Sequence, residues 1–161
     1  MNKYIKFMAF AMMAVFSLAF VSCEDDDDAP SMGDGKIEVN GKQYSLSPIT
    51  NEGSWDSYDN TGDFTVAVMN ADDVDYYEFE FESSEEPKVG DDFANMNLTL
   101  MPLVAAPDVD IEEYSYSGGS AKITSTNESE DEMTVKFSNL KMKCGSNTFT
   151  FNGTATLMFD F

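Results

Sequence analysis

The sequence contains no histidine and no arginine, and its nine basic residues, all lysine, face 30 aspartates and glutamates in a chain of 161 residues. Without histidine there is no imidazole base, no His-ligated zinc or haem, and no Ser-His-Asp or Cys-His catalytic unit. Without arginine there is no planar fork for two-point binding of phosphate or carboxylate. The formal net charge of −21 repels nucleic acid, so we expect no nucleic-acid partner.

Carboxylates alone could still support catalysis, as they do in retaining and inverting glycosidases. In this chain no pair of acidic residues stands out by its spacing, and few residue types remain that could bind and orient a substrate. We therefore predict that the protein is not an enzyme and has no catalytic residues. We expect no cofactor apart from a covalent lipid, with calcium considered below.

A long hydrophobic run occurs near the N-terminus. Lys3 and Lys6 are followed by an uncharged run of 15 residues, Phe7 to Val21. As a helix this run would be about 22 Å long at about 1.5 Å per residue, which is short of the roughly 30 Å hydrocarbon core of a membrane. A basic start followed by a short apolar run is typical of a signal peptide, and we assign residues 1–22 to it.

The apolar run ends at Val21-Ser22-Cys23, and five acidic residues, Glu24 to Asp28, follow directly. This ending resembles the lipobox of bacterial lipoproteins, which implies cleavage before Cys23 and a diacylglyceryl thioether on its sulfur. An ordinary secretory signal with an incidental cysteine is the alternative. The acidic tract resembles the export signal of Bacteroidetes lipoproteins, which implies a lipid anchor in the outer membrane and a protein facing the cell exterior. Since like charges repel and keep the tract extended and solvated, a plain spacer is the alternative, and we expect residues 23–35 to be a flexible tether.

The body, residues 36–161, is large enough for one domain with a single core. Asn40-Gly41 between two short alternating runs predicts a tight hairpin, and Tyr77, Phe79 and Phe81 alternate with glutamates as in a strand with one buried face. We expect an all-β fold, a single antiparallel β-sandwich or partly closed barrel of roughly nine short strands. The other expected strands are Phe64–Met69, Asn97–Met101, Ala121–Thr126, Met133–Phe137, Thr148–Phe151 and Thr154–Phe161, with turns that include Gly118-Gly119 and Asn152-Gly153.

This layout resembles that of the small uncharacterised surface lipoproteins of Bacteroidetes. The likeness rests on the opening hairpin, the strand start at Gly118 to Thr124 and the closing run Phe149 to Thr154. It implies a β-sandwich, and it transfers no catalytic or binding residue.

A loop at Asn51 to Asp63 contains the single tryptophan, Trp55, together with Tyr58, Asp56 and Asp59. Aromatic rings stack on the C–H faces of sugars, while carboxylates accept hydrogen bonds from sugar hydroxyls. The loop therefore predicts a glycan-binding site at these four residues. In the alternative interpretation, Trp55 closes one end of the core and Tyr58 anchors the loop.

The same loop is a candidate calcium site through Asp56, Asp59 and Asp63, because hard cations prefer several carboxylate and carbonyl oxygens on one turn, and Gly62 would let the backbone wrap an ion. The spacing of an EF-hand is absent. A solvated acidic surface is the alternative.

Two functions are consistent with these features. One is a cell-surface lipoprotein that acts as a non-catalytic binding or interaction module, with an extracellular glycan or an outer-membrane protein as its partner. The other is a structural subunit of an outer-membrane assembly with no small-molecule ligand. The exposure of Trp55 separates them, because a ring on the surface beside Tyr58 favours a ligand site, whereas a buried ring leaves a protein interface or no site at all.

Overall fold

The computed structural model describes residues 35–47, 51–70, 73–103, 112–127, 129 and 131–160, and these contain nine strands and one short 3-10 helix. The signal peptide, the lipidation site Cys23 and the tether up to residue 34 lie outside the described residues. The elements are β1 (Lys36–Val39), β2 (Lys42–Leu46), β3 (Glu52–Asp56), β4 (Thr61–Met69), β5 (Val74–Glu82), η2 (Phe93–Asn95), β6 (Thr99–Leu103), β7 (Tyr114–Asn127), β8 (Glu132–Cys144) and β9 (Asn147–Asp160).

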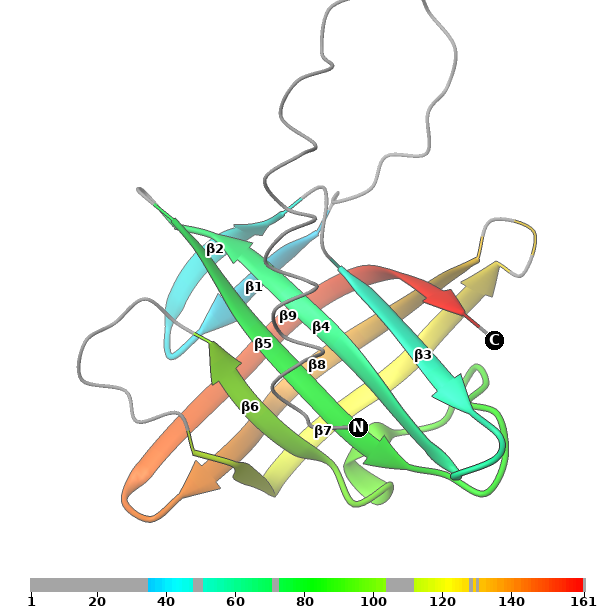
Figure 1. Cartoon of the computed structure of the whole chain (residues 1–161). Coiled ribbons are helices and arrows are strands. Elements are labelled where there is room, and N and C mark those ends of the chain that lie inside the picture. Colours follow the sequence, from blue (N-terminus) through cyan, green and yellow to red (C-terminus); the bar gives the residue numbers. More distant parts are fainter. Residues whose placement is uncertain are drawn as a thin grey trace, which may run out of the picture. The chain divides into compact units, whose positions relative to one another are not determined.

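The hydrogen-bonded strand pairs close on themselves in a ring (Figure 1). Around the ring, β1 is followed in order by β2, β4, β5, β6, β7, β8 and β9, each paired with the one before it, and β9 pairs with β1. β3 fills the space between β4 and β9, and its pairing with β9 is parallel, whereas the other pairs are antiparallel. The all-β prediction is confirmed, and a sandwich or partly closed barrel is consistent with this ring. Asn40 and Gly41 both have positive φ, at 51° and 81°, so the predicted tight hairpin is confirmed as well.

β3 corrects the prediction that residues 51–63 form one loop. Asn51, although polar, is buried, because its side chain accepts a hydrogen bond from the backbone N–H of Ala67 at 2.9 Å and donates one to the carbonyl of Ser47. Gly53 then lets the strand lie close to its neighbours, since a Cβ at this position would be 2.9 Å from a ring atom of Phe159. A glycine that suggests a loop in the sequence is here required by close packing within the sheet.

The predicted turns at Gly118-Gly119 and Asn152-Gly153 are also wrong, because these residues lie inside the long strands β7 and β9. The pairing of β7 with β8 and of β8 with β9 shifts register beside them, and Asn139 of β8 has a φ of 48°. Gly119, Asn139 and Gly153 therefore form a line across three strands, here called the bend line, at which β-bulges bend the sheet. The glycines permit sharp bending without ending the strands.

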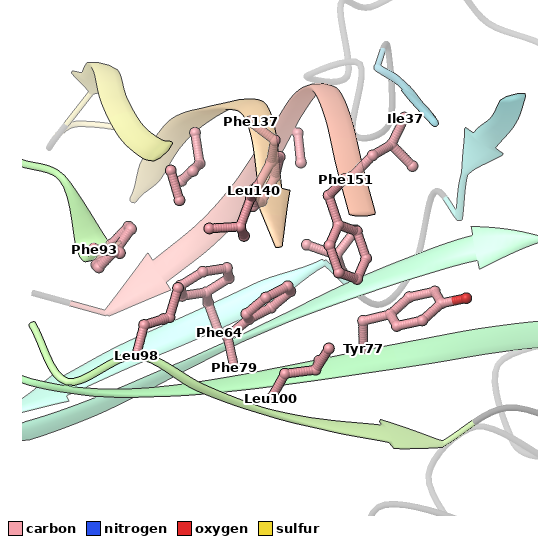
Figure 2. Packing of buried hydrophobic residues seen from close by; sticks show 14 of the residues in the cluster. Ile37, Phe64, Tyr77, Phe79, Phe93, Leu98, Leu100, Phe137, Leu140 and Phe151 are labelled. Atoms are coloured by element: carbon pink, nitrogen blue, oxygen red, sulfur yellow. The ribbon is translucent and has the colours of Figure 1, made fainter. Parts of the chain in front are cut away.

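One hydrophobic core lies inside the ring, between β4–β6 on one side and β8–β9 on the other (Figure 2). Phe79 is stacked on Phe64 at 4.8 Å between ring centroids and meets Phe151 edge-on at 5.4 Å. Phe93 of η2 packs 4.8 Å from Phe64 and closes one end. The core residues are the inward-facing residues of the strands, and along β5 they are every second residue. The period-two pattern of the sequence therefore identified the buried face of this strand correctly.

Candidate functional site

The candidate site residues lie on the β3–β4 hairpin, whose connecting turn, residues 57–60, is called the Tyr58 turn below. Trp55 and Asp56 are the last two residues of β3, Asp59 is in the turn, and Asp63 is on β4. These residues are close in sequence, but successive side chains of a strand point to opposite faces of the sheet, so they do not all point in one direction.

Trp55 is half-buried and packs against the hydrophobic core. Its indole Nε1 donates a hydrogen bond to the carbonyl of Ser83 at 3.2 Å, and the N–H of Ser83 donates to the carbonyl of Asn60 at 2.9 Å. Two hydrogen bonds in opposite directions thus attach the hairpin to the segment that follows β5. The apolar ring and the polar atom of Trp55 both have structural partners, so Trp55 covers one end of the core. This half-buried position agrees with the alternative interpretation of Trp55 more than with a ring on the surface.

Ser83 did not stand out in the sequence, because its role is a backbone contact with a residue 28 positions away. Such a contact depends on tertiary structure and leaves no local pattern. The signal that could have suggested it is indirect: a half-buried tryptophan usually finds an acceptor for its N–H.

Tyr58 is 90% exposed, so it is the exposed aromatic ring of this hairpin. The conformation of the turn is stabilised by a hydrogen bond from the backbone N–H of Tyr58 to Oδ1 of Asp56 at 2.7 Å. Asn60 completes the turn in a left-handed conformation with φ of 56°. Asp56 and Asp59, two residues before and one residue after Tyr58 in the sequence, are both exposed. An exposed aromatic ring can stack on a sugar, and exposed carboxylates on the same hairpin can accept hydrogen bonds from the sugar hydroxyls.

The three candidate calcium ligands are not gathered around one point. Within the described ranges, no group of three or more acidic or cysteine side chains could hold a metal ion. Asp56 uses one oxygen to accept the hydrogen bond of the turn, and Asp63 faces outward from β4 opposite Glu80. The hairpin geometry thus supports the solvated acidic surface more than the calcium site.

Asp63 belongs to an acidic area on the outward side of β3, β4 and β5, where it lies directly opposite Glu80 in the pairing. Glu52, at the start of β3, lies beside it, and burial together with the charge of Asp63 raises the pKa of Glu52 above its ordinary value. Like charges at opposite positions of paired strands destabilise a sheet. The hairpin that carries the Tyr58 turn therefore has several carboxylates on its outward side.

Cys144 is the last residue of β8. It is half-buried against the core, and its thiol donates a hydrogen bond to the carboxylate of Glu112 at 2.9 Å.

Comparisons with protein-family models, with curated proteins and with solved structures gave no match. In the part of the chain that the structure describes, no helix has the length and apolar character needed to cross a membrane. The case for a function therefore rests on the residues and their geometry.

Proposed function

We propose that this protein is a lipid-anchored cell-surface protein that acts as a non-catalytic binding or interaction module. One observation carries this proposal: Cys23 stands at the end of a short apolar run and is followed by five acidic residues. A lipid anchor on Cys23 attaches the β domain stably without a transmembrane helix, since each buried CH₂ contributes about 0.8 kcal/mol. The outer membrane is the partner of the anchor, and the domain faces the cell exterior.

The Tyr58 turn is the proposed ligand site, and an extracellular glycan is the proposed ligand. Its support is the combination of a ring that is 90% exposed with two exposed carboxylates, Asp56 and Asp59. Trp55 belongs to the site as its support, because it attaches the hairpin to Ser83. An exposed aromatic ring on a fixed turn loses little conformational entropy when it binds, and this favours recognition.

The anchor is tested by expressing the full chain and a Cys23→Ala variant in a Bacteroidetes host, with labelling by an alkyne-tagged fatty acid and digestion of intact cells by an added protease. We expect label on the wild type, no label on the variant, and degradation of the wild type from outside the cell. An unlabelled wild type would exclude lipidation, and a labelled protein resistant to the protease would exclude the exterior location.

The ligand site is tested by a glycan array with the wild type, Tyr58→Ala and Trp55→Phe. We expect Tyr58→Ala to abolish binding without lowering the melting temperature, because the side chain makes little contact with the domain. Trp55→Phe removes one hydrogen bond and is expected to cost about 1 kcal/mol of stability. If no glycan binds the wild type and an outer-membrane protein co-purifies with it from native membranes, the structural-subunit alternative is the correct one.

A further inference from the structure

The outward side of β7, β8 and β9 differs in charge from the rest of the chain. From Tyr114 to Asn127, from Met133 to Cys144 and from Asn147 to Phe159 there is no acidic residue, although the chain has 30. The exposed residues are mainly Ser, Thr and Asn, together with four lysines: Lys122, Lys136, Lys141 and Lys143. This outward surface is called the lysine face.

Two lysines of this face lie close to each other, and one acidic residue, Asp92, borders the face because it forms an isolated β-bridge with Lys122. Lys122 and Lys136 are paired directly across β7 and β8, which places their Cα atoms about 5 Å apart. Both side chains point outward, because the neighbouring residues Ala121, Ile123 and Val135 are buried. Among the described residues the one salt bridge is between Lys88 and Glu85, outside the lysine face.

A third lysine extends this row onto the next strands. Lys136 pairs with Thr154 of β9, and the neighbouring Gly153 pairs with Ile37 of β1. Lys36 precedes the buried Ile37 and is exposed, so it lies on the same outward side beside Thr154. The row therefore crosses β7, β8, β9 and β1 and carries lysines on three of these four strands. At its edge on β1 the next outward residue is Glu38, whose carboxylate accepts a hydrogen bond from the side chain of Asn152 at 3.3 Å.

The direct pairing of Lys122 with Lys136 lowers the stability of the sheet. Like charges directly opposite each other in a sheet are unfavourable, and the chain has carboxylates in excess that could have neutralised them. An anionic partner would remove this repulsion. At physiological salt the field of the acidic surface on other strands is screened within about 8 Å, so it does not cancel the local attraction.

The length and curvature of the lysine face indicate the form of the partner. From Lys136 to Lys143 along β8 the distance is on the order of 20 Å at about 3.3 Å per residue, which exceeds the size of one small anion. The bend line passes between Lys136 and Lys141, and Figure 2 shows the ribbons of β8 and β9 curving sharply there. Because the core lies inside the ring, this face is convex, a shape that a flexible chain follows more closely than a flat membrane surface does.

We propose that the lysine face binds an acidic polysaccharide, a flexible chain with repeated carboxylate or sulfate groups. The lysines contact the anionic groups, and the surrounding hydroxyl and amide side chains form hydrogen bonds with the sugar. The choice of a polysaccharide over another polyanion rests on the proposed location at the cell exterior. The site is separate from the Tyr58 turn and does not need it.

The experiment measures binding of the full chain, purified in neutral detergent, to heparin, to polygalacturonate and to neutral dextran at several salt concentrations. A Lys122→Gln/Lys136→Gln variant is compared with a Lys42→Gln/Lys88→Gln variant, which has the same change in charge away from the face. We expect the first variant to bind heparin or polygalacturonate about tenfold more weakly and with a smaller salt dependence, and the second to change by less than about twofold.

Dextran is expected not to bind, and melting curves confirm that both variants are folded. Absence of polyanion binding at low salt, or equal loss in the two variants, would overturn the proposal. Equal affinity for an oligothymidylate would also overturn it, because the face would then recognise nucleic acid as well. The protease test of intact cells is independent, so failure of the surface location and failure of this site are distinguishable.

Discussion

The two sides of the ring use the same kind of inward residue and opposite kinds of outward residue. β4 and β5 direct Phe64 and Phe79 inward and carry Asp63 and Glu80 outward. β8 directs Phe137 inward, and the outward residues on either side of it are Lys136 and Ser138. The inward residues meet in one core, where Phe79 and Phe137 stack at 5.9 Å between ring centroids.

This comparison separates what maintains the fold from what is available for binding. Burial of aromatic and aliphatic side chains is the dominant favourable term, and it depends only on every second residue of each strand. The outward residues can therefore carry one sign of charge on one side and the other sign elsewhere, at a cost of a few tenths of a kcal/mol per like-charged pair, up to about 1 kcal/mol. Substitutions that disrupt the shared core should accordingly lower stability more than substitutions on either outward side.

The largest effect is expected from Phe79→Ala. Its ring contacts Phe64 on β4 and both Phe137 and Phe151 across the core, so the cavity would affect both sides of the ring. Loss of a buried phenylalanine side chain costs about 3–5 kcal/mol. Urea denaturation followed by tryptophan fluorescence measures this change.

Glu80→Ala is the matched control for Phe79→Ala, since it changes the next residue on the same strand. Glu80 is exposed and lies opposite Asp63. The substitution is expected to change the free energy of unfolding by less than about 0.5 kcal/mol. Similar losses for the two variants would show that β5 does not have one buried and one exposed side.

The next largest effect is expected at the bend line. In Gly119→Ala the new Cβ would lie 1.9 Å from the carbonyl oxygen of Asn139, at a φ of 85°. Gly41→Ala provides the control, because it has a similar φ of 81° and open space around it. The left-handed conformation alone costs about 1–2 kcal/mol, so we expect about that loss for Gly41→Ala and at least about twice as much for Gly119→Ala, measured by urea denaturation. Equal losses would mean that the strands can separate at the bend without cost.

These glycines also show which parts of the fold could be predicted from the sequence. Period-two alternation correctly predicted the class of the fold, the buried face of β5 and the Asn40-Gly41 hairpin, because all three are set by local chemistry. Gly53, Gly119 and Gly153 were misinterpreted as loop or turn residues, since a glycine needed for close contact between strands has the same appearance in a sequence as one needed for a turn.

The candidate site was predictable to a similar extent. The position of Tyr58 in an exposed turn followed from composition, but the role of Trp55 depended on Ser83, which is distant in the sequence. The lysine face could not be predicted, because it requires the register of β7 against β8, including its bulges. Local patterns thus identify which residues face outward, and only strand pairing shows which of them become neighbours.

The smallest effect is expected for Glu52→Gln, which tests the acidic side alone. The pKa of Glu52 is raised in the folded state, first by burial and second by the charge of Asp63, relative to an ordinary value of 4.5. The folded state therefore holds this proton more tightly than the unfolded state. The resulting stability is fully present below about pH 4.5 and is lost as the pH rises through the pKa of the folded state.

Relative to wild type, Glu52→Gln should accordingly gain stability as the pH rises from about 4 to about 7, by no more than a few tenths of a kcal/mol because solvent screens the partly exposed group. Melting temperatures across this range measure the difference, and Glu86→Gln, an exposed residue outside the strands, is the control. Asp63→Asn separates the two causes. Since burial is the larger cause, most of the pH dependence due to Glu52 should persist in that variant. Its complete disappearance would instead mean that repulsion between carboxylates, the property that distinguishes this side of the ring from the lysine face, controls the ionisation of Glu52.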